Sequence, residues 1–222
     1  MKFNLANTSG SATSRLKPWG IYTVEFKGIE NKTGTTKDGR TWKAFQLKFE
    51  APEGTYEQMF FCPGEGGDKR RTGETGGRKW ELPSEMENFA GNIAHFVSVM
   101  NPEGFTKIQG KLNLDLPREF DKLVEVLAAA LKSAIGRTFY LKLVGNNRGY
   151  ADIPSLIRIS KEGNAFPANN WLSSTEGRLA FSPYEMREKD KAAATTPTQM
   201  PDVEVPEGDN KDDDLDLDLT DL

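Results

Sequence analysis

Alternating apolar and polar positions predict three consecutive β-strands near the start of the chain. The pattern holds over three segments, 19–28, 40–50 and 56–62. In the second segment the apolar residues share one face, which leaves Trp42 on the polar face. Turn-forming residues fill the gaps, including an Asp-Gly pair at Asp38, so we expect a loop over 31–39 and a three-stranded meander.

Helical periodicity follows in two segments. Ser84 and Glu87 have the spacing of a capping box, and apolar residues then recur every three or four positions until Pro102. A second amphipathic helix is expected from Pro117, a favoured first-turn residue, to Gly136. Both helices therefore have one face suited to packing on the strands.

The segment between the third strand and the first helix, 63–79, shows no periodicity. It contains six glycines and five basic residues against three acidic ones. Because glycine permits irregular backbone at little steric cost, we predict a basic, mobile loop here.

The second half of the chain predicts two more strands and then loses its pattern. Residues 138–144 alternate cleanly, and 150–160 form a fifth strand interrupted by Pro154. The end of the chain combines low apolarity with high net charge, which is typical of disorder. Four parts are thus predicted: a flexible lead (1–18), a folded domain (19–160), an arm that packs on this body or on a neighbouring protomer (161–187), and a disordered linker with an acidic tail (188–222).

Three strands, a helical connection and two strands are the order of elements in an OB-fold, a partly open Greek-key barrel. The predicted fold class is mainly β with helices: a five-stranded OB-fold barrel with a helical insertion between strands 3 and 4, plus a disordered acidic tail. Such barrels bind oligonucleotides on their second and third strands and on the loops that join strands one to two and four to five.

Composition argues against several classes of function. The 222 residues include one cysteine, Cys62, and one histidine, His95, too few for a zinc site with three or four nitrogen or sulfur ligands. A Ser-His-Asp or Cys-His catalyst would depend on His95 alone. Asp115, Glu119 and Asp121 are better explained as acids near a helix start than as metal ligands. We expect no catalytic residue, no metal and no cofactor, and so no enzyme.

The same composition bears on location. No apolar run approaches the roughly 18 residues of a membrane-spanning helix, and residues 1–14 lack the apolar core of a signal peptide. A lone cysteine suits a reducing compartment. We therefore expect a cytoplasmic protein without membrane contact, in the host cytoplasm if the protein is viral.

Basic and aromatic residues are interleaved where an OB-fold would bind a nucleic-acid strand. Phosphates attract Lys and Arg, and unpaired bases stack on aromatic rings. Any single aromatic residue could equally belong to the core, but Trp42 is the strongest candidate because its strand already turns other apolar residues inward. The candidate DNA-binding residues are Lys32, Lys37, Arg40, Trp42, Lys43, Lys48, Tyr56, Phe60, Lys69, Arg70, Arg71, Arg78, Lys79, Trp80, Arg148 and Tyr150.

The net charge of -4 averages two unlike parts of the chain. Ten acidic residues and one basic residue follow Pro201, so this tail carries -9 and the rest of the chain +5. Four leucines are spaced among the last acids, which favours a docking segment over a solubilising tag. The candidate partner-binding residues are Asp212, Asp213, Asp214, Leu215, Asp216, Leu217, Asp218, Leu219, Asp221 and Leu222.

The order of elements over 19–160 and the composition of the tail resemble the single-stranded DNA-binding proteins of bacteriophages and bacteria, and the bacteriophage proteins in particular. The resemblance implies sequence-independent coating and protection of single-stranded DNA in DNA replication, recombination and repair. It also implies that the tail recruits replication proteins, such as a polymerase or a helicase, and competes with DNA. The arm would also allow a homo-oligomer. Many tails of this family end in Phe, whereas this one ends in Leu222, and the zinc site of one phage branch has no counterpart here.

Two other classes of function stay open from the residues alone. An adaptor would bind proteins through an OB-like body and its tail, without intrinsic nucleic-acid binding. A metal-dependent nuclease would need clustered carboxylates, and the predicted structured regions contain no group with convincing spacing.

Overall fold

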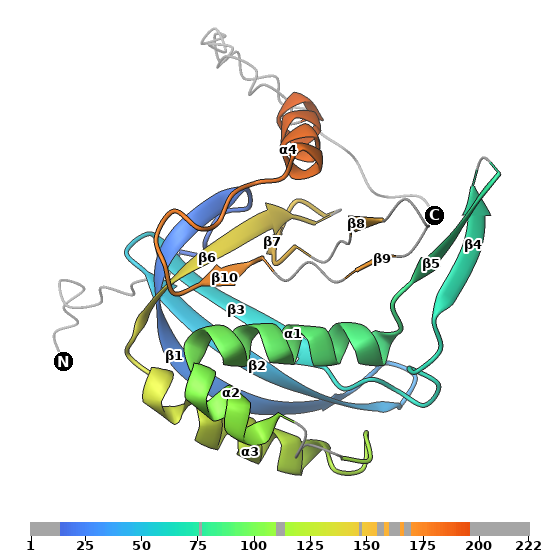
Figure 1. Ribbon diagram of the computed structural model, residues 1–222, viewed down its shortest axis with the longest axis vertical. Coiled ribbons are helices and arrows are strands. Elements are labelled where there is room, and N and C mark those ends of the chain that lie inside the picture. Colours follow the sequence, from blue (N-terminus) through green and yellow to red (C-terminus); the bar gives the residue numbers. More distant parts are fainter. Residues whose placement is uncertain are drawn as a thin grey trace, which may run out of the picture.

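The protein is described by a computed structural model that covers residues 14–75, 77–109, 114–146, 148–154, 158–159, 165–166 and 170–195. Within them the chain is mainly β with helices (Figure 1). The predicted acidic tail, with all its candidate partner-binding residues, and the lead up to residue 13 lie outside the described residues.

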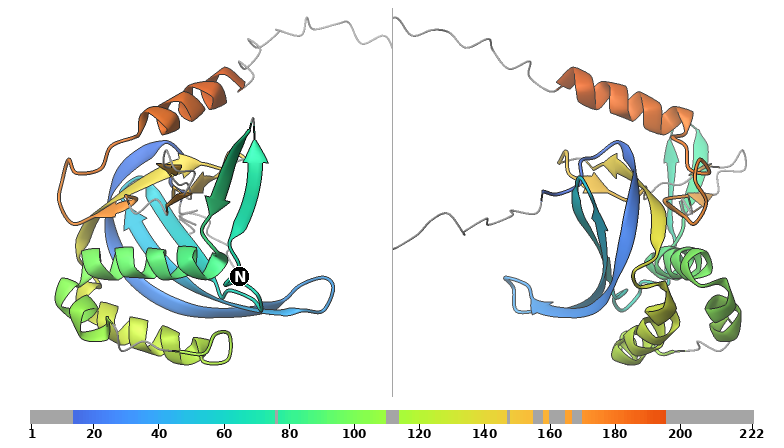
Figure 2. Two further views of the ribbon diagram at one scale, coloured as in Figure 1. Left: turned by 45° about the vertical axis from the view of Figure 1, so that its right-hand side comes forward. Right: turned by 90° about the vertical axis from the view of Figure 1, so that its left-hand side faces the viewer.

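Antiparallel strands form one curled sheet, a half-barrel that is best seen in Figure 2. Its strands are β1 (Gly20–Thr35), β2 (Thr41–Ala51), β3 (Gly54–Phe61), β6 (Thr138–Gly145) and β10 (Leu172–Ser173). Their order across the sheet is β10, β6, β1, β2, β3. Because β2 pairs with β1 on one side and with β3 on the other, the predicted meander is confirmed.

The first strand is longer than the alternation predicts. The expected loop over 31–39 is wrong in its first half, because β1 continues to Thr35, which pairs with Thr41. Gly34 lies opposite Trp42, and the indole ring lies so close to this glycine that a Cβ atom there would collide with it. A glycine that looks like a turn residue in the sequence therefore makes room for a cross-strand tryptophan.

Three helices separate the first strands from β6 and pack against one side of the sheet (Figures 1 and 2). They are α1 (Glu85–Met100), α2 (Pro102–Ile108) and α3 (Phe120–Leu131). The predicted capping box at the start of α1 is confirmed. The backbone N–H of Glu87 donates to Ser84 Oγ at 3.0 Å, and the N–H of Ser84 donates to a Glu87 carboxylate oxygen at 2.8 Å.

Two helix boundaries differ from the expected ones. The second predicted helix, 117–136, is shorter, because α3 begins at Phe120 and a 3-10 turn (Lys132–Ala134) follows it. Pro102 ends α1 as predicted but also lies in the first turn of α2. Asn101 stabilises this second start, since its side chain accepts a hydrogen bond of 3.0 Å from a backbone N–H of that turn.

Aromatic rings fill the space between the sheet and the helices. The ring centroid of Phe45 lies 5.1 Å from that of Phe60, 5.9 Å from Phe96 on α1 and 6.3 Å from Phe120 on α3. All four rings are buried. This face of the sheet is therefore closed to solvent.

The predicted glycine-rich loop over 63–79 is wrong in its second half, because two strands form a hairpin there. β4 (Arg71–Thr75) pairs with β5 (Arg78–Leu82). Trp80 lies opposite Gly73, and its ring lies where a larger side chain would be. The large apolar residues of the two strands are Trp80 and Leu82, too few to give an alternating pattern in the sequence.

The predicted fourth strand is confirmed as β6, but the predicted fifth strand over 150–160 is wrong as one element. Of its described residues, Ala151–Asp152 form β7, which pairs with β6, whereas β8 (Arg158–Ile159) pairs with β9 (Ala165–Phe166). Pro154 follows β7 closely, and a proline has no N–H with which to continue the ladder.

From residue 170 the arm folds back onto its own body. Trp171 is fully buried, and its Nε1 donates to Asn92 Oδ1 of α1 at 3.1 Å. The backbone N–H of Leu172 donates to His95 Nε2 at 3.3 Å. The helix α4 (Pro183–Thr195) follows, so the expectation of a disordered linker from residue 188 is wrong over its first residues.

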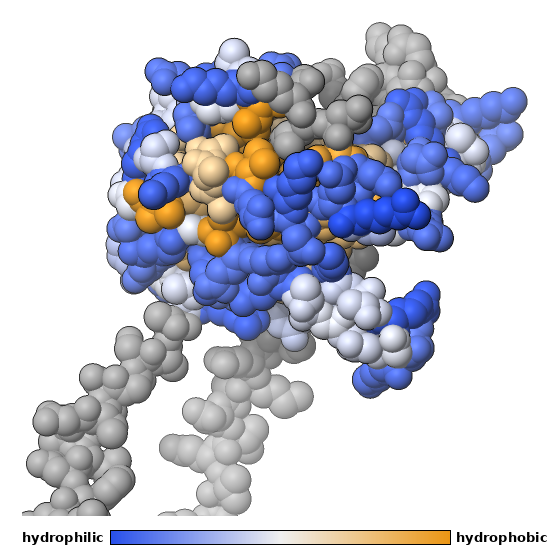
Figure 3. Space-filling view, turned by 90° about the horizontal axis from the view of Figure 1, so that it is seen from below, coloured by the Kyte–Doolittle hydropathy of each residue, from blue (hydrophilic) through white to orange (hydrophobic). Residues whose placement is uncertain are grey.

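The surface seen from below mixes hydrophobic and hydrophilic residues (Figure 3). Ile135, directly after the 3-10 turn, is 52% exposed. In the described part of the chain, no helix has the length and apolarity needed to cross a membrane.

Candidate nucleic-acid interface

The meander has one face that the helices do not cover. Phe45 and Leu47 of β2 point into the core, so Gln46 between them points the other way, and Met59 of β3 lies opposite Gln46. We call this surface the outer strand face. It comprises Glu30, Lys32, Trp42, Gln46, Lys48, Glu57, Met59 and Phe61.

Two aromatic side chains lie together on the outer strand face. The ring of Trp42 is half-buried and meets the ring of Phe61 edge to face, with 5.5 Å between their centroids. Phe61 is 55% exposed. The alternation in β2 predicted the outward position of Trp42. Phe61 was not among the candidate residues, although the aromatic residues on both faces of segment 56–62 were a signal for it.

Two candidate lysines flank this surface and share one carboxylate. Glu30 lies 2.7 Å from the ammonium of Lys32 and 2.5 Å from that of Lys48. These two hydrogen bonds, first from Lys32 and then from Lys48, lower the pKa of Glu30 to about 2. Both lysines are therefore held in place by the carboxylate of Glu30.

Two further candidate bases are also paired with acids, but they lie elsewhere. Lys43 belongs to the helix side of β2, where its ammonium lies 2.5 Å from Asp121 at the start of α3. The hydrogen bond from Lys43 lowers the pKa of Asp121, with a smaller contribution from Asn31. Arg40 forms an ion pair with Asp38 in the β1–β2 turn. Lys43 therefore does not lie on the outer strand face.

Two candidate aromatic residues prove to be part of the core. Tyr56 and Phe60 are each more than nine-tenths buried. Phe60 stacks on Phe45, and the Tyr56 hydroxyl donates to the Gln58 side chain. The expectation that these two rings offer stacking surfaces is corrected, because apolar neighbours already cover them.

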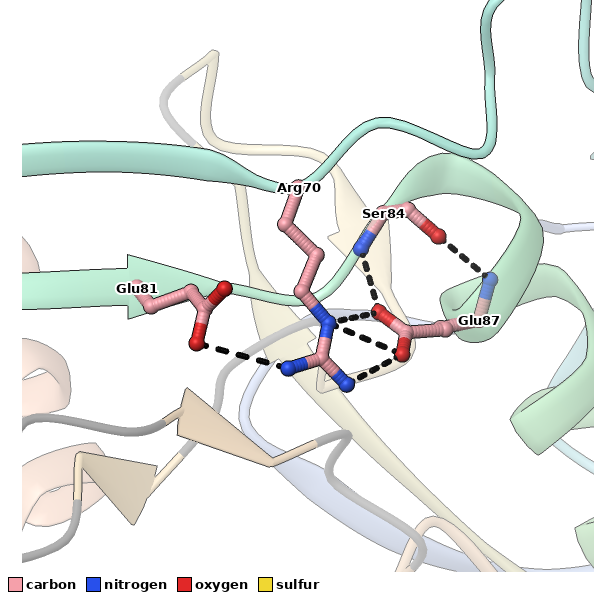
Figure 4. Close-up of polar contacts among 4 residues, drawn as sticks. All are labelled: Arg70, Glu81, Ser84 and Glu87. Atoms are coloured by element: carbon pink, nitrogen blue, oxygen red, sulfur yellow. Dashed lines mark hydrogen bonds and ion pairs between the residues drawn. The ribbon is translucent and has the colours of Figure 1, made fainter.

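The β4–β5 hairpin holds the candidates of the glycine-rich segment apart from the outer strand face. It stands on the side of the helices (Figure 2), and Arg70 at its base is held by acids of α1 and β5 (Figure 4). Arg70 Nε donates to both carboxylate oxygens of Glu87 at 2.9 Å, and its Nη1 lies 3.3 Å from Glu81. The pairing with Arg70, followed by the N–H of Ser84, lowers the pKa of Glu87 to about 2.

The remaining candidate residues of the hairpin differ in their exposure to solvent. Lys69, Arg71 and Lys79 are exposed and form no ion pair with another described residue. Trp80 is half-buried. The side chain of Arg78 lies outside the described part. The exposed Lys37, in the β1–β2 turn, likewise has no ion-pair partner among the described residues.

The turn between β6 and β7 presents an aromatic side chain beside the outer strand face. Asn146 Oδ1 accepts the backbone N–H groups of Arg148 at 3.0 Å and Tyr150 at 3.1 Å, which fixes the turn. Tyr150 is 64% exposed and lines a pocket of about 580 Å³. We call it the Tyr150 pocket. Gln46, Glu57 and Met59 of the outer strand face also line it.

The pocket is completed by a segment that the sequence analysis assigned to a flexible lead. The N–H of Leu16 donates to the carbonyl of Thr55 at 3.0 Å, and the N–H of Thr55 donates to the carbonyl of Ser14 at 2.8 Å. Leu16 is buried. This anchor places the cationic Arg15 and Lys17 at the pocket, two residues that were not among the predicted candidates. The isolated apolar Leu16 was the available signal.

The surroundings of the lone histidine and cysteine favour the neutral form of both side chains. Burial lowers the pKa of His95 to about 4, and the neutral ring accepts the N–H of Leu172. Burial also raises the pKa of the Cys62 thiol, which disfavours the reactive thiolate. No group of three or more His, Cys, Asp or Glu residues that could hold a metal ion occurs in the part of the chain that the structure describes.

Comparisons with models of known protein families, with curated proteins and with solved structures find no match to this chain.

Proposed function

We propose that this protein binds single-stranded DNA without sequence preference and thereby coats and protects it in replication, recombination and repair, as the bacteriophage proteins that it resembles do. The observation that carries the proposal is the outer strand face. There an accessible aromatic pair, Trp42 and Phe61, lies on the same surface as Lys32 and Lys48. Tyr150, Arg15 and Lys17 extend the same chemistry at the neighbouring pocket.

The physical argument joins two contributions. A base that stacks on an aromatic ring gains about 1 to 3 kcal/mol whatever its identity. A phosphate that replaces Glu30 between Lys32 and Lys48 keeps both lysines paired, so the exchange costs little and releases counterions. A surface that combines the two favours a flexible single strand over a rigid duplex, whose bases are already stacked.

The arrangement of strands supports an OB-fold as the finer description. The meander, the helices between it and β6, and the return to β7 follow the element order of that barrel. In an OB-fold the nucleic acid lies on strands two and three, which here are β2 and β3. The helical insertion between strands 3 and 4 and the disordered acidic tail remain parts of the same proposal.

The proposal assigns the tail two roles, recruitment of replication proteins such as a polymerase or a helicase and competition with DNA for the basic surface. Its acidic sequence supports both, since ten acids in 21 residues can pair with Lys and Arg on this body or on a partner.

Titration of the full-length protein with oligo-dT, followed by tryptophan fluorescence, tests the proposal. Four cations on and beside the outer strand face predict a log-log salt slope of about -3. Trp42→Ala should weaken binding by about 1 to 3 kcal/mol. Tyr184→Ala, which removes a more exposed ring on α4, serves as the control and should leave the affinity unchanged. A flat salt response, or equal effects of the two variants, would overturn the proposal and favour a protein-binding adaptor.

A further inference from the structure

The Tyr150 pocket lies beside the outer strand face, and its lining comes from four separate parts of the chain. Six of its lining residues matter here: Arg15, Lys17, Gln46, Glu57, Met59 and Tyr150. A volume of about 580 Å³ lies inside the range of about 300 to 1,000 Å³ that small-molecule sites occupy.

The walls are held by hydrogen bonds that do not involve a ligand. On one side, the backbone bonds to Thr55 fix the segment of Arg15, and the Tyr22 hydroxyl donates to the carbonyl of Lys17 at 2.9 Å. On the other side, Asn146 fixes the turn that carries Tyr150. The pocket is thus formed before anything binds, which lowers the entropy cost of binding.

The floor of the pocket offers hydrogen-bond acceptors. Gln46 is 6% exposed, and its Nε2 donates to one carboxylate oxygen of Glu57 at 2.7 Å. This bond orients the carboxamide and leaves Gln46 Oε1 and the second oxygen of Glu57 without a described partner. An ionised carboxylate only accepts hydrogen bonds. The floor therefore favours a ligand edge that presents N–H donors.

The walls offer an aromatic ring for the base of a nucleotide and positive charge for its phosphate. Tyr150 supplies an accessible ring against which a base can stack, and Arg15 and Lys17 supply positive charge for its phosphate. The thioether of Met59 adds an apolar contact.

We propose that the Tyr150 pocket binds a single nucleotide unit whose base carries an exocyclic amino group. The amino group donates to Glu57, the base stacks on Tyr150, and the phosphate pairs with Arg15 and Lys17. Thymine and uracil lack this amino group and place carbonyl oxygens there instead, so they are disfavoured. The pocket would hold one nucleotide of a bound strand, so this proposal rests on the proposed function. It adds a modest base preference at one position of the strand.

An NMR titration of the full-length protein with dCMP, dTMP and deoxyribose 5-phosphate tests the pocket directly. We expect dCMP to shift the backbone amides of Gln46, Glu57 and Tyr150, and dTMP to bind about tenfold more weakly, the ratio that corresponds to about 1.4 kcal/mol. Glu57→Gln, which keeps the size of the side chain but adds an N–H donor, should bring the two affinities together. Equal shifts by all three compounds in the unaltered protein would overturn the base preference, and no shifts at these amides would overturn the pocket.

A second measurement separates the pocket from the proposed function. Oligo-dC and oligo-dT of equal length are titrated into the unaltered protein, Glu57→Gln and Tyr150→Ala. If both oligonucleotides bind but neither variant changes their affinities or ratio, the subsite is wrong and the proposed function stands. If neither oligonucleotide binds while dCMP shifts the pocket amides, the ligand is a free nucleotide and the proposed function fails.

Discussion

Lys142 of β6 is entirely buried, and its ammonium lies 3.0 Å from the carboxylate of Glu185 on α4. The same ammonium donates to the carbonyl of Ala180 at 3.1 Å. Glu185 also accepts the backbone N–H of Ser182 in a capping box that begins α4. One carboxylate thus starts the helix and neutralises a charge inside the body, which attaches the last described element to the sheet.

The first prediction concerns this ion pair. Glu185→Gln should destabilise the protein by about 3 kcal/mol, because a buried ammonium loses its counter-charge. The measurement is urea unfolding followed by circular dichroism. Glu188→Gln on the same helix is the matched control, since its pair with Lys191 is solvent-exposed and contributes about 0.5 kcal/mol or less. Similar losses in the two variants would contradict the assignment of the buried pair.

A second prediction concerns the carboxylate between Lys32 and Lys48. Glu30→Gln frees both lysines, so we expect binding to oligo-dT to tighten by about two- to fivefold at low salt and the salt slope to become steeper. Fluorescence titration at several salt concentrations measures both quantities. Glu53→Gln, which removes the same charge from the β2–β3 turn, controls for the change in net charge. Equal tightening in the two variants would show that Glu30 acts only through long-range charge.

A third prediction concerns Phe61. Because this ring is more than half exposed, Phe61→Ser should cost little stability but weaken binding to oligo-dT by about 1 to 3 kcal/mol. Ile135→Ser removes an apolar side chain of similar exposure from the helix side and should not change the affinity. The opposite order of effects would place the binding surface on the helices.

The fourth prediction concerns the acidic tail. Deletion of 202–222 removes ten acids and one base, so DNA binding should strengthen if the tail competes for the basic surface. The affinity of the deleted chain for oligo-dT is compared with that of the full-length chain at two salt concentrations. An unchanged or weaker affinity would refute the competition.

A fifth prediction concerns pH. The folded-state pKa of His95 is depressed to about 4, below an unfolded value of about 6.5, because the ring is buried. The neutral ring's contribution to stability is therefore complete above pH 6.5 and is lost as the pH falls toward 4, by up to about 3 kcal/mol. Protonation would also remove the acceptor for the N–H of Leu172.

Unfolding of the unaltered protein and of His95→Gln between pH 4 and 7 measures this effect. The variant keeps a side-chain acceptor but no titrating ring, so its stability should fall less with acid. Parallel pH profiles would assign the acid sensitivity to carboxyl groups such as Glu87, whose pKa is lowered to about 2 by its pairing with Arg70.

Local signals in the sequence predicted much of the fold. The Ser84–Glu87 capping box and the outward position of Trp42 each depend on neighbours within one element. The meander depends on strands that follow one another directly along the chain. A second capping box of the same kind, Ser182 with Glu185 around Pro183, was present in the sequence and missed because the apolar pattern beyond it is weak. α4 was therefore assigned to the arm and the linker.

The candidate site was harder to predict because ion pairs join distant parts of the chain. Lys43 and Asp121 are 78 positions apart, and nothing in the sequence indicates that α3 would bring the acid to β2. Tyr56 and Phe60 could not be told from surface aromatics, because segment 56–62 has aromatic residues on both faces. Only the packing of the helices shows that one of these faces is core.

The pairing of β10 with β6 has a consequence for the handling of this protein in solution. A strand at the edge of a sheet presents unpaired N–H and C=O groups that recruit other chains into aggregates. Here the backbone of 171–173 occupies that edge along part of β6, and the N–H of Lys142 donates to the carbonyl of Trp171 at 2.8 Å. A chain shortened to end before residue 170 would uncover this edge together with the buried Lys142, so such fragments should aggregate more readily than the longer chain.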